Sequence, residues 1–183
     1  SEMCIRDRSE IDTQETSQRI GAVNVGDSRI YLFTNNVLHQ ISIDHSLVQE
    51  LIDNGKISEI EAKSHPQRNV ITRSLGHQPI IEVDAWEIDL IIGDRYLLCS
   101  DGLTNEISDT EIAEILSTQS DPQQAADQLI QSALENEGLD NVTAIVADVL
   151  LGKEERNSSI IQFDVQTLSP EEDKKFSEGK TPN

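Results

Sequence analysis

Three aspartates lie at turns next to apolar, strand-like stretches, and this setting suits metal chemistry. Asp27 stands in VGDSR, Asp101 in CSDGL and Asp140 in LDNVT. A carboxylate at a strand end projects from a rigid sheet, and a nearby glycine lets the backbone turn or approach closely. Converging carboxylates repel one another unless a cation lies between them, and such oxygen ligands suit Mg²⁺ and Mn²⁺. The three residues therefore favour a divalent metal site, although each Asp-Gly or Asp-Asn pair alone is more often an ordinary turn.

The elements that carry Asp27 are expected to be strands. Apolar and β-branched residues at 19–25 and 29–33 predict two of them, and the break between them falls on Asp27. An Asn-Asn pair at 35–36 is typical of a tight hairpin turn, so residues 37–43 are predicted to return as a partner strand. Asp27 should therefore lie where the chain leaves one strand and enters the next.

Two short helices are predicted next, at 46–54 and 58–63. Each begins with a serine that has Gln or Glu three residues later, which is the spacing of a capping box. Gly55 stands just past the first helix, where glycine favours a helix end. Alternating apolar residues at 80–89 then predict an edge-like strand.

The elements around Asp101 are apolar strands separated by helices. A strand at 95–100 leads directly into Asp101, and another at 142–150 closes the ordered part of the chain. Helices are predicted from 108 to about 116 and from the Asp-Pro pair at 121 to about 138. The second helix has an apolar stripe at helical spacing, formed by Ala125, Ala126, Leu129, Ile130, Ala133 and Leu134. Strands and helices occur in blocks, which favours packed sheets with helices outside over a doubly wound parallel sheet.

Five phrases of the sequence occur in the order seen in one enzyme family. They are NVGDSRIYLF (24–33), IDHSLVQELIDNGKIS (43–58), HPQRNVITRSLG (65–76), GDRYLLCSDGLTNEIS (93–108) and DNVTAIVADV (140–149). On these phrases the chain resembles the bacterial PP2C-like (PPM) phosphatases, which are metal-dependent serine/threonine protein phosphatases, over roughly residues 19–149. The resemblance implies an α+β fold, an αββα sandwich in which helices flank an antiparallel β-sandwich, here incomplete at the N-terminus. It also implies a domain at 9–150 with a flap beside the active site at about 44–76.

The resemblance assigns metal ligands position by position. Asp101 and Asp140 match the aspartates that coordinate the family's metal pair, and Asp27 together with Asp101 matches a third, more weakly bound metal. Asn141 is expected to support the turn that aims Asp140 rather than to bind metal. The full set of expected supporting residues is Gly102, Asn141 and Ser100.

Charged flap residues are the other candidates for a functional role. Arg68 and Arg73 lie in the phrase HPQRNVITRS and could reach a phosphate or an acidic partner, although a flap arginine is more often paired with a local carboxylate. His45 and His65 also lie in flap phrases. Neither shows a metal-binding helical spacing, so structural hydrogen bonds are expected for both.

The implied activity is hydrolysis of phosphoserine and phosphothreonine in proteins by a water that two metal ions activate. Two Mn²⁺ or Mg²⁺ ions, with a third in the complete domain, would lower the pKa of that water and stabilise charge on the phosphoryl oxygens. The implied partners are phosphorylated proteins, together with a serine/threonine kinase and its substrates. The implied location is cytoplasmic.

Two phrases of the family are absent from this sequence. One is an Arg…Asn-x-Asp segment with the phosphate-binding arginine, and the other is a DGMGGH-like segment with the bridging aspartate and the proposed general acid. Nothing in residues 1–18 resembles either phrase. The chain by itself is therefore predicted to be inactive or nearly so, while the full gene product is expected to be active. Two alternatives stay open: a degenerate phosphatase that acts as a regulatory binding module, and a regulatory phosphatase domain of a larger protein.

The two ends of the chain differ from the rest. The octapeptide SEMCIRDR at 1–8 resembles the translated end of a transposon adapter used for sequencing libraries, so an artefact is predicted, with an ordinary polar N-terminus as the alternative. Residues 151–183 are mainly polar or charged and are predicted to form an acidic, disordered tail. Such a segment buries too little apolar surface to offset its ordering entropy. Only the apolar stretch at 159–165 is a candidate for an added strand.

The composition excludes several classes of function. A formal net charge of −20 over 183 residues argues against a surface for nucleic acid or for an anionic membrane. No apolar run approaches a membrane span, so a soluble protein is expected. Cys4 and Cys99 are the only cysteines, and Cys99 lies in an apolar strand. A buried thiol in a reducing compartment is therefore expected.

Overall fold

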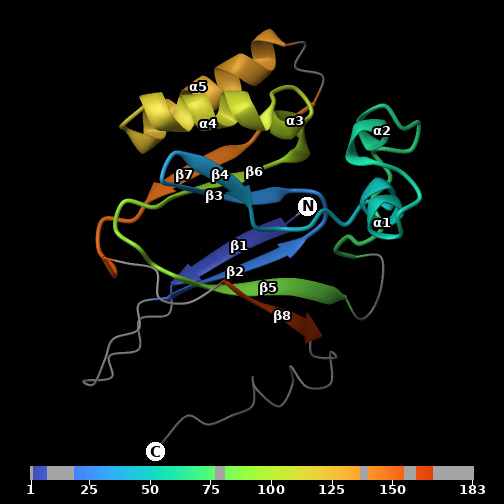
Figure 1. The fold of residues 1–183 in the computed structure, drawn as a ribbon, viewed down its shortest axis with the longest axis horizontal. Helices are drawn as coiled ribbons and strands as arrows, with labels where there is room; N and C mark the ends of the chain where they lie inside the picture. The colour runs from blue at the N-terminus through green and yellow to red at the C-terminus, as the bar shows by residue number, and fades with distance from the viewer. Residues whose placement is uncertain (1, 8–18, 77–80, 137–139, 155–159, 167–183) are drawn as a thin grey trace, which may run out of the picture.

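The structure, a computed structural model, describes residues 2–7, 19–76, 81–136, 140–154 and 160–166. Two four-stranded antiparallel sheets pack against each other in this part of the chain (Figure 1). The first, the β2 sheet, has the strand order β1 (Glu2–Asp7), β2 (Arg19–Val25), β5 (Glu82–Asp89) and β8 (Ile161–Gln166). The second, the β6 sheet, has the strand order β4 (Val37–Gln40), β3 (Arg29–Thr34), β6 (Arg95–Cys99) and β7 (Ala144–Asp148).

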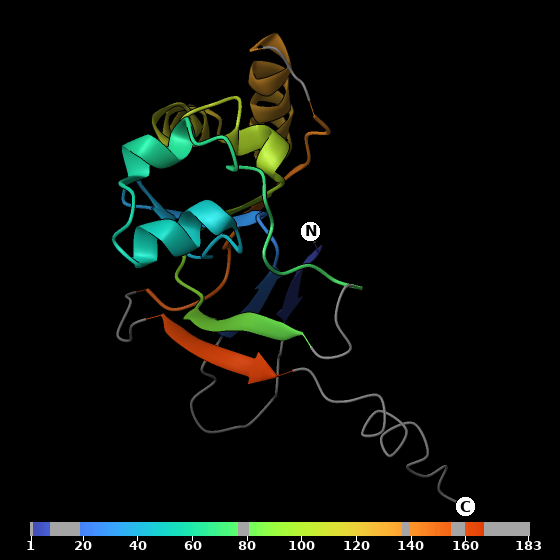
Figure 2. The ribbon, with the colours of Figure 1, turned by 90° about the vertical axis from the view of Figure 1, so that its right-hand side faces the viewer.

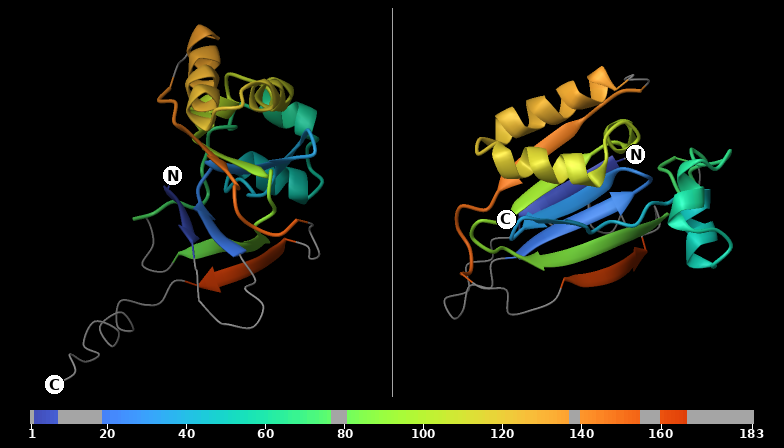
Figure 3. Two further views of the ribbon diagram at one scale, coloured as in Figure 1. Left: turned by 90° about the vertical axis from the view of Figure 1, so that its left-hand side faces the viewer. Right: turned by 45° about the horizontal axis from the view of Figure 1, so that its top comes forward.

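Helices flank this sandwich on one outer face and at one side. Within the described residues they are α1 (Leu47–Asp53), α2 (Glu59–Lys63), α3 (Asp101–Thr104), α4 (Asp109–Thr118) and α5 (Pro122–Glu135). α4 and α5 cover the outer face of the β6 sheet, whereas α1 and α2 stand at the side of the sandwich (Figures 1 and 2). In the described part of the chain, the outer face of the β2 sheet carries no helix (Figure 3). The fold is therefore α+β, with one of the two helix layers of an αββα sandwich.

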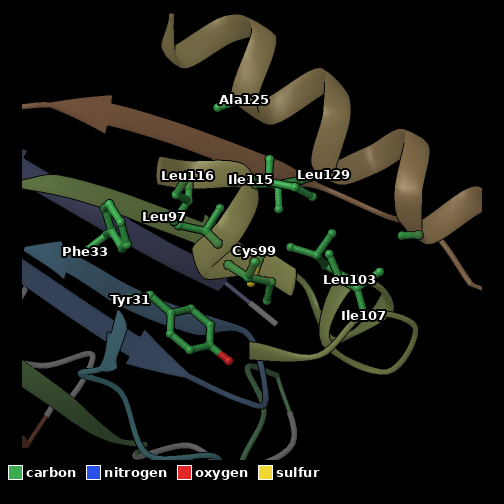
Figure 4. Close-up of a cluster of buried hydrophobic side chains, with 12 residues drawn as sticks. Tyr31, Phe33, Leu97, Cys99, Leu103, Ile107, Ile115, Leu116, Ala125 and Leu129 are labelled. Atoms are coloured by element: carbon green, nitrogen blue, oxygen red, sulfur yellow. The ribbon is translucent and has the colours of Figure 1, made fainter. Parts of the chain in front are cut away.

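Two apolar cores share strand β6. The core between the sheets contains Ile20, Ala22, Ile30, Leu32, Trp86, Ile88, Tyr96, Leu98 and Val149. The core between the β6 sheet and its helices is built on Tyr31, Phe33, Leu97, Cys99, Leu103, Ile107, Ile112, Ile115, Leu116, Ala125, Leu129 and Ala133 (Figure 4). Successive side chains of a strand point to opposite faces, so a strand buried on both faces is apolar throughout. This explains the continuous apolar run YLLC at 96–99.

Cys99 behaves as the sequence predicts. It is a buried free thiol in the core under α4 and α5. Burial raises the pKa of this thiol to about 12, so at neutral pH it stays protonated and unreactive.

The chain passes from one sheet to the other at Gly26-Asp27, between β2 and β3. The hairpin that follows is tight because Asn35 and Asn36 adopt φ values of 50° and 63°. Two central residues with positive φ define the turn type whose twist matches that of paired strands. β3 and β4 then pair from Tyr31↔Gln40 to Thr34↔Val37, as the Asn-Asn pair predicts.

The segment after this hairpin forms the two predicted short helices. Ser46 caps α1 by accepting the amide hydrogen of Gln49. Ser58 and Glu61 form a complete capping box at the start of α2. Gly55 has φ of 64°, so a left-handed glycine follows α1 as expected.

Some elements differ from the sequence-based expectations. β5 is not an edge strand, because β8 pairs with it from Glu82↔Gln166 to Glu87↔Ile161. β8 overlaps the apolar stretch 159–165, which was the candidate for an added strand. Residues 155–159 and 167–183 lie outside the described residues, so the disordered tail stays a prediction. The helical turn α3 was not predicted, since four residues are too few to produce a periodic pattern.

The first strand falls within the octapeptide that resembles an adapter. Residues 2–7 pair with β2 in an antiparallel register that runs from Glu2↔Val25 to Asp7↔Ile20. Strand pairing does not depend on the origin of the coding DNA, so the adapter origin of residues 1–8 stays a prediction. None of the helices in the described residues combines the length and the apolar character that a bilayer span requires.

Candidate metal centre

Asp27 is positioned by the crossing between the two sheets. Gly26, the last residue before it, has φ of 112°, a backbone conformation that favours glycine. Asp27 is half-buried, and Ser28 after it is buried. The sequence GDS thus supplies a glycine where the backbone must reverse and a carboxylate directly after it.

Asp101 and Asp140 are brought together by a close approach of two backbones. Asp101 opens α3 directly after β6, and Gly102 follows it. A Cβ added at Gly102 would overlap the carbonyl oxygen of Asn141 and would lie 3.6 Å from the Cβ of Asp140. Only glycine therefore lets the SDG turn lie against the DN turn at this distance.

Ser100 and Asn141 fix the same contact with hydrogen bonds. The Ser100 hydroxyl donates to the carbonyl oxygen of Asn141 (3.1 Å) and accepts the amide hydrogen of Thr143 (3.0 Å). The Asn141 amide donates to Oδ1 of Asp140 (2.7 Å), which orients that carboxylate. All three expected supporting residues thus lie at the junction between Asp101 and Asp140.

The charges of the three aspartates act on one another. Burial raises the pKa of Asp101 above its ordinary value, and the nearby carboxylates of Asp27 and Asp140 raise it further. In the described part of the chain, no ion pair neutralises Asp101 or Asp140. Asp27 and Asp140 therefore lie near enough to Asp101 for their charges to act on it, and this repulsion would favour a cation beside Asp101.

The donor set fits a hard divalent cation in kind but is not complete in number. Carboxylate oxygens are the ligands that Mg²⁺ and Mn²⁺ prefer. Among the described residues, however, no three or more His, Cys, Asp or Glu side chains are close enough together to enclose a metal ion. Further ligands must supplement Asp27, Asp101 and Asp140 before a closed coordination shell forms.

The loop of Asp27 is held by residues that the sequence did not single out as functional. Arg29 donates to both oxygens of Asp44 at 2.7–3.0 Å. Nδ1 of His45 accepts the amide hydrogen of Gly26, and Nε2 of His45 lies 3.1 Å from Oδ2 of Asp84. Asp84 lies on the inward face of β5. The sequence could have indicated a role for Asp84, because this charged residue stands at an inward position of an alternating strand and a buried carboxylate needs hydrogen-bond partners.

The two flap arginines and the flap histidines have different environments. Arg73 donates to Oδ1 of Asp84 (3.1 Å), so it is paired with a carboxylate. The Arg68 side chain makes no hydrogen bond or ion pair within the described residues, and no contact brings either arginine to the three aspartates. His45 and His65 both accept backbone amide hydrogens through Nδ1, which confirms the structural hydrogen bonds expected for them.

Two packed antiparallel sheets, with helices on one outer face and three aspartates at turns beside their strands, are the features to compare with known proteins. The serine/threonine phosphatase stp of Listeria monocytogenes is 43% identical over 136 residues, which are 74% of this chain and 54% of that protein. The crystal structure of the Mycobacterium tuberculosis serine/threonine phosphatase PstP/Ppp matches with a TM-score of 0.68 and 44% identity, over 73% of this chain and 56% of that one. The catalytic domain of PstP in complex with two manganese ions matches with a TM-score of 0.65 and 43% identity, over 72% and 54%.

These similarities agree with the five phrases and establish the family. The chain belongs to the PPM (PP2C-like) serine/threonine phosphatases. No family model matches it. The chain spans 54% of the Listeria protein and 25% of the Mycobacterium tuberculosis protein PstP.

Proposed function

We propose that the protein to which this chain belongs hydrolyses phosphoserine and phosphothreonine in other proteins with the help of divalent cations. The observation that carries the proposal is that the half-buried Asp101 lies beside Asp27 and Asp140. Burial and these two carboxylates raise the pKa of Asp101. The relatives named as serine/threonine phosphatases and the neighbour that holds two manganese ions support it. Phosphorylated proteins, and a kinase that modifies them, are the proposed partners, and the cytoplasmic location stays a prediction.

The residues of this chain have separable tasks in that reaction. Asp101 and Asp140 would hold the metal pair, and Asp27 with Asp101 would hold a third ion. Cations bound there would supply an activated water of lowered pKa and positive charge next to the phosphoryl oxygens. Gly102, Ser100 and Asn141 keep two of the ligands at a fixed separation.

We further propose that this chain alone has at most trace activity. It spans 54% of its Listeria relative, and its described carboxylates do not enclose an ion by themselves. The phosphate-binding arginine and the general acid expected for the family have no counterpart in residues 1–18. Without them, substrate positioning and protonation of the leaving group both fail.

The test compares this chain with the longest product of the same gene. Phosphate release from a phosphothreonine peptide is measured with and without Mn²⁺, and the Asp101→Asn variant of the longer product serves as the control. We expect turnover only from the longer product and a loss of at least about a hundredfold in the variant. Robust turnover by this chain would refute its inactivity. A longer product that binds Mn²⁺ but never turns over would favour the regulatory binding module instead.

A further inference from the structure

We propose that His45 is a positioning residue for Asp27. Through its ring and its backbone, His45 holds the peptide that precedes Asp27 and ties it to the flap and to β5. The functional part of this inference rests on the proposed function, because the placement of Asp27 matters for catalysis only if Asp27 binds metal.

The contact with the Asp27 loop has two points. The Gly26 amide donates to Nδ1 of His45 at 3.0 Å, and the His45 amide donates to the Gly26 carbonyl oxygen at 3.0 Å. The His45 side chain is only 2% exposed, so these bonds do not compete with bulk water. One residue therefore satisfies both polar backbone groups of Gly26, whose φ of 112° sets the direction of the chain into Asp27.

The ring of His45 is fixed from its other side. Its Nε2 lies 3.1 Å from Oδ2 of Asp84. Because Nδ1 accepts the Gly26 amide hydrogen, the hydrogen-bond pattern assigns the ring proton to Nε2, which donates to Asp84. Arg73 donates to the other oxygen of Asp84 at 3.1 Å, so that carboxylate is itself anchored. This arrangement resembles the outer-shell contacts that orient ligands at metal sites.

The same residue joins the two ends of the flap. The carbonyl oxygen of His45 accepts the Thr72 amide hydrogen at 2.8 Å, and the next residue, Ser46, forms a β-bridge with Ile71. The segment that enters the flap and the segment that leaves it therefore meet at His45 and Ser46. A displacement of the flap at His45 would therefore act on Gly26, because both the ring and the backbone amide of His45 are hydrogen-bonded to Gly26.

Amide hydrogen exchange of the full chain tests the positioning directly. His45→Asn keeps an acceptor at the position of Nδ1 but cannot reach Asp84, whereas His45→Gln reaches toward Asp84 but lacks that acceptor. We expect exchange at Gly26 to accelerate about tenfold in His45→Ala and His45→Gln and to return near the wild-type rate in His45→Asn. His65→Asn is the matched control, since His65 accepts an amide only within its own turn, from Gln67 (3.2 Å).

A purely structural role for His45 predicts a different pattern. Exchange throughout β2 and β5 would then accelerate in parallel with global unfolding, and His45→Asn would not restore Gly26. That result would overturn the inference. If His45→Ala does not fold, the Asn and Gln variants still separate the two outcomes, because each keeps one of the two contacts.

A Mn²⁺ titration of the same variants tests the link to metal. Paramagnetic broadening is followed at the amides of Asp27 and Asp140. We expect the midpoint of broadening at these amides to rise about tenfold in His45→Gln and to stay unchanged in the control His65→Asn. Equal midpoints in the variant and the wild type would overturn the inference that His45 positions Asp27 for metal binding. Absence of broadening in the wild type would instead count against the metal site of the proposed function, while the exchange experiment still decides the contact with Gly26.

Discussion

Two charged regions of this molecule are built in opposite ways. At one of them, Arg95 pairs with Asp148, with Nη2 and Oδ2 2.8 Å apart and a second contact from Nε. Its remaining donors bind the carbonyl oxygens of Leu116, Gln119 and Ser120 at the end of α4. All five N–H groups of the guanidinium thus donate a hydrogen bond, and the Asp148 carboxylate neutralises the positive charge.

At the candidate metal centre, no ion pair within the described residues compensates the charge of Asp101 or Asp140. Asp101 lies beside Asp27 and Asp140, and its pKa is raised by burial and by these two neighbouring carboxylates. A search for cavities alone would point to the Arg95 region, because a cavity of about 320 Å³ is lined by Arg95 and Asp148. The comparison teaches that a complete set of partners marks the Arg95 charge as structural, whereas the raised pKa of Asp101 beside two other carboxylates makes the aspartates the better candidates for binding.

Removal of Arg95 should have the largest effect on stability and none on metal binding. We expect Arg95→Ala to lower the free energy of unfolding by about 4 kcal/mol, because Asp148 and three carbonyl oxygens then lose a charged donor. Urea denaturation measures this. Arg68→Ala, which removes an exposed flap arginine, is the matched control and should change stability by less than about 0.5 kcal/mol. A loss of Mn²⁺ affinity in folded Arg95→Ala would contradict the separation of the two regions.

Features that depend on local chemistry could be predicted from the sequence. The serine caps at Ser46 and Ser58 and the turn at 35–36 are decided by neighbouring residues, and the structure has all of them. The grouping of Asp101 with Asp140 could be expected from the family phrases, but the physical reason needs coordinates. Gly102 is required because a distant backbone segment lies against it.

Features that depend on distant pairing could not be predicted. Nothing in residues 82–89 indicates that a strand from 161–166 pairs with them, and so β5 was mistaken for an edge strand. The partners of Asp84 come from 11 and 39 residues away in sequence. Periodicity reports which face of a strand is buried but not which polar group meets it there.

Gly102→Ala should have an intermediate effect that is specific to the metal region. We expect a loss of about 2 kcal/mol, because the added methyl group overlaps the Asn141 carbonyl and the two turns must separate. Gly93→Ala is the matched control near Arg95: Gly93 has φ of 88° but open space around it, so strain of about 1 kcal/mol is expected without displacement of any ligand. Thermal unfolding with and without Mn²⁺ measures both. Equal Mn²⁺-induced stabilisation of the two variants would show that the close approach at Gly102 does not set the metal ligands.

Asp101→Asn should have the smallest effect on stability and should act in the opposite direction. The raised folded-state pKa of Asp101 means that the folded protein holds this proton to a higher pH than the unfolded chain, whose ordinary value is 3.8. Stability contributed by the protonated group is present below that value and is lost as the pH rises through the folded pKa. Without metal, the variant should therefore match the wild type at pH 3 and exceed it by about 0.5 kcal/mol at pH 7, a magnitude typical of partly exposed charge pairs. Asp127→Asn on the exposed side of α5 controls for the change in net charge. Addition of Mn²⁺ should reverse the order, because a cation stabilises only the protein that keeps the carboxylate.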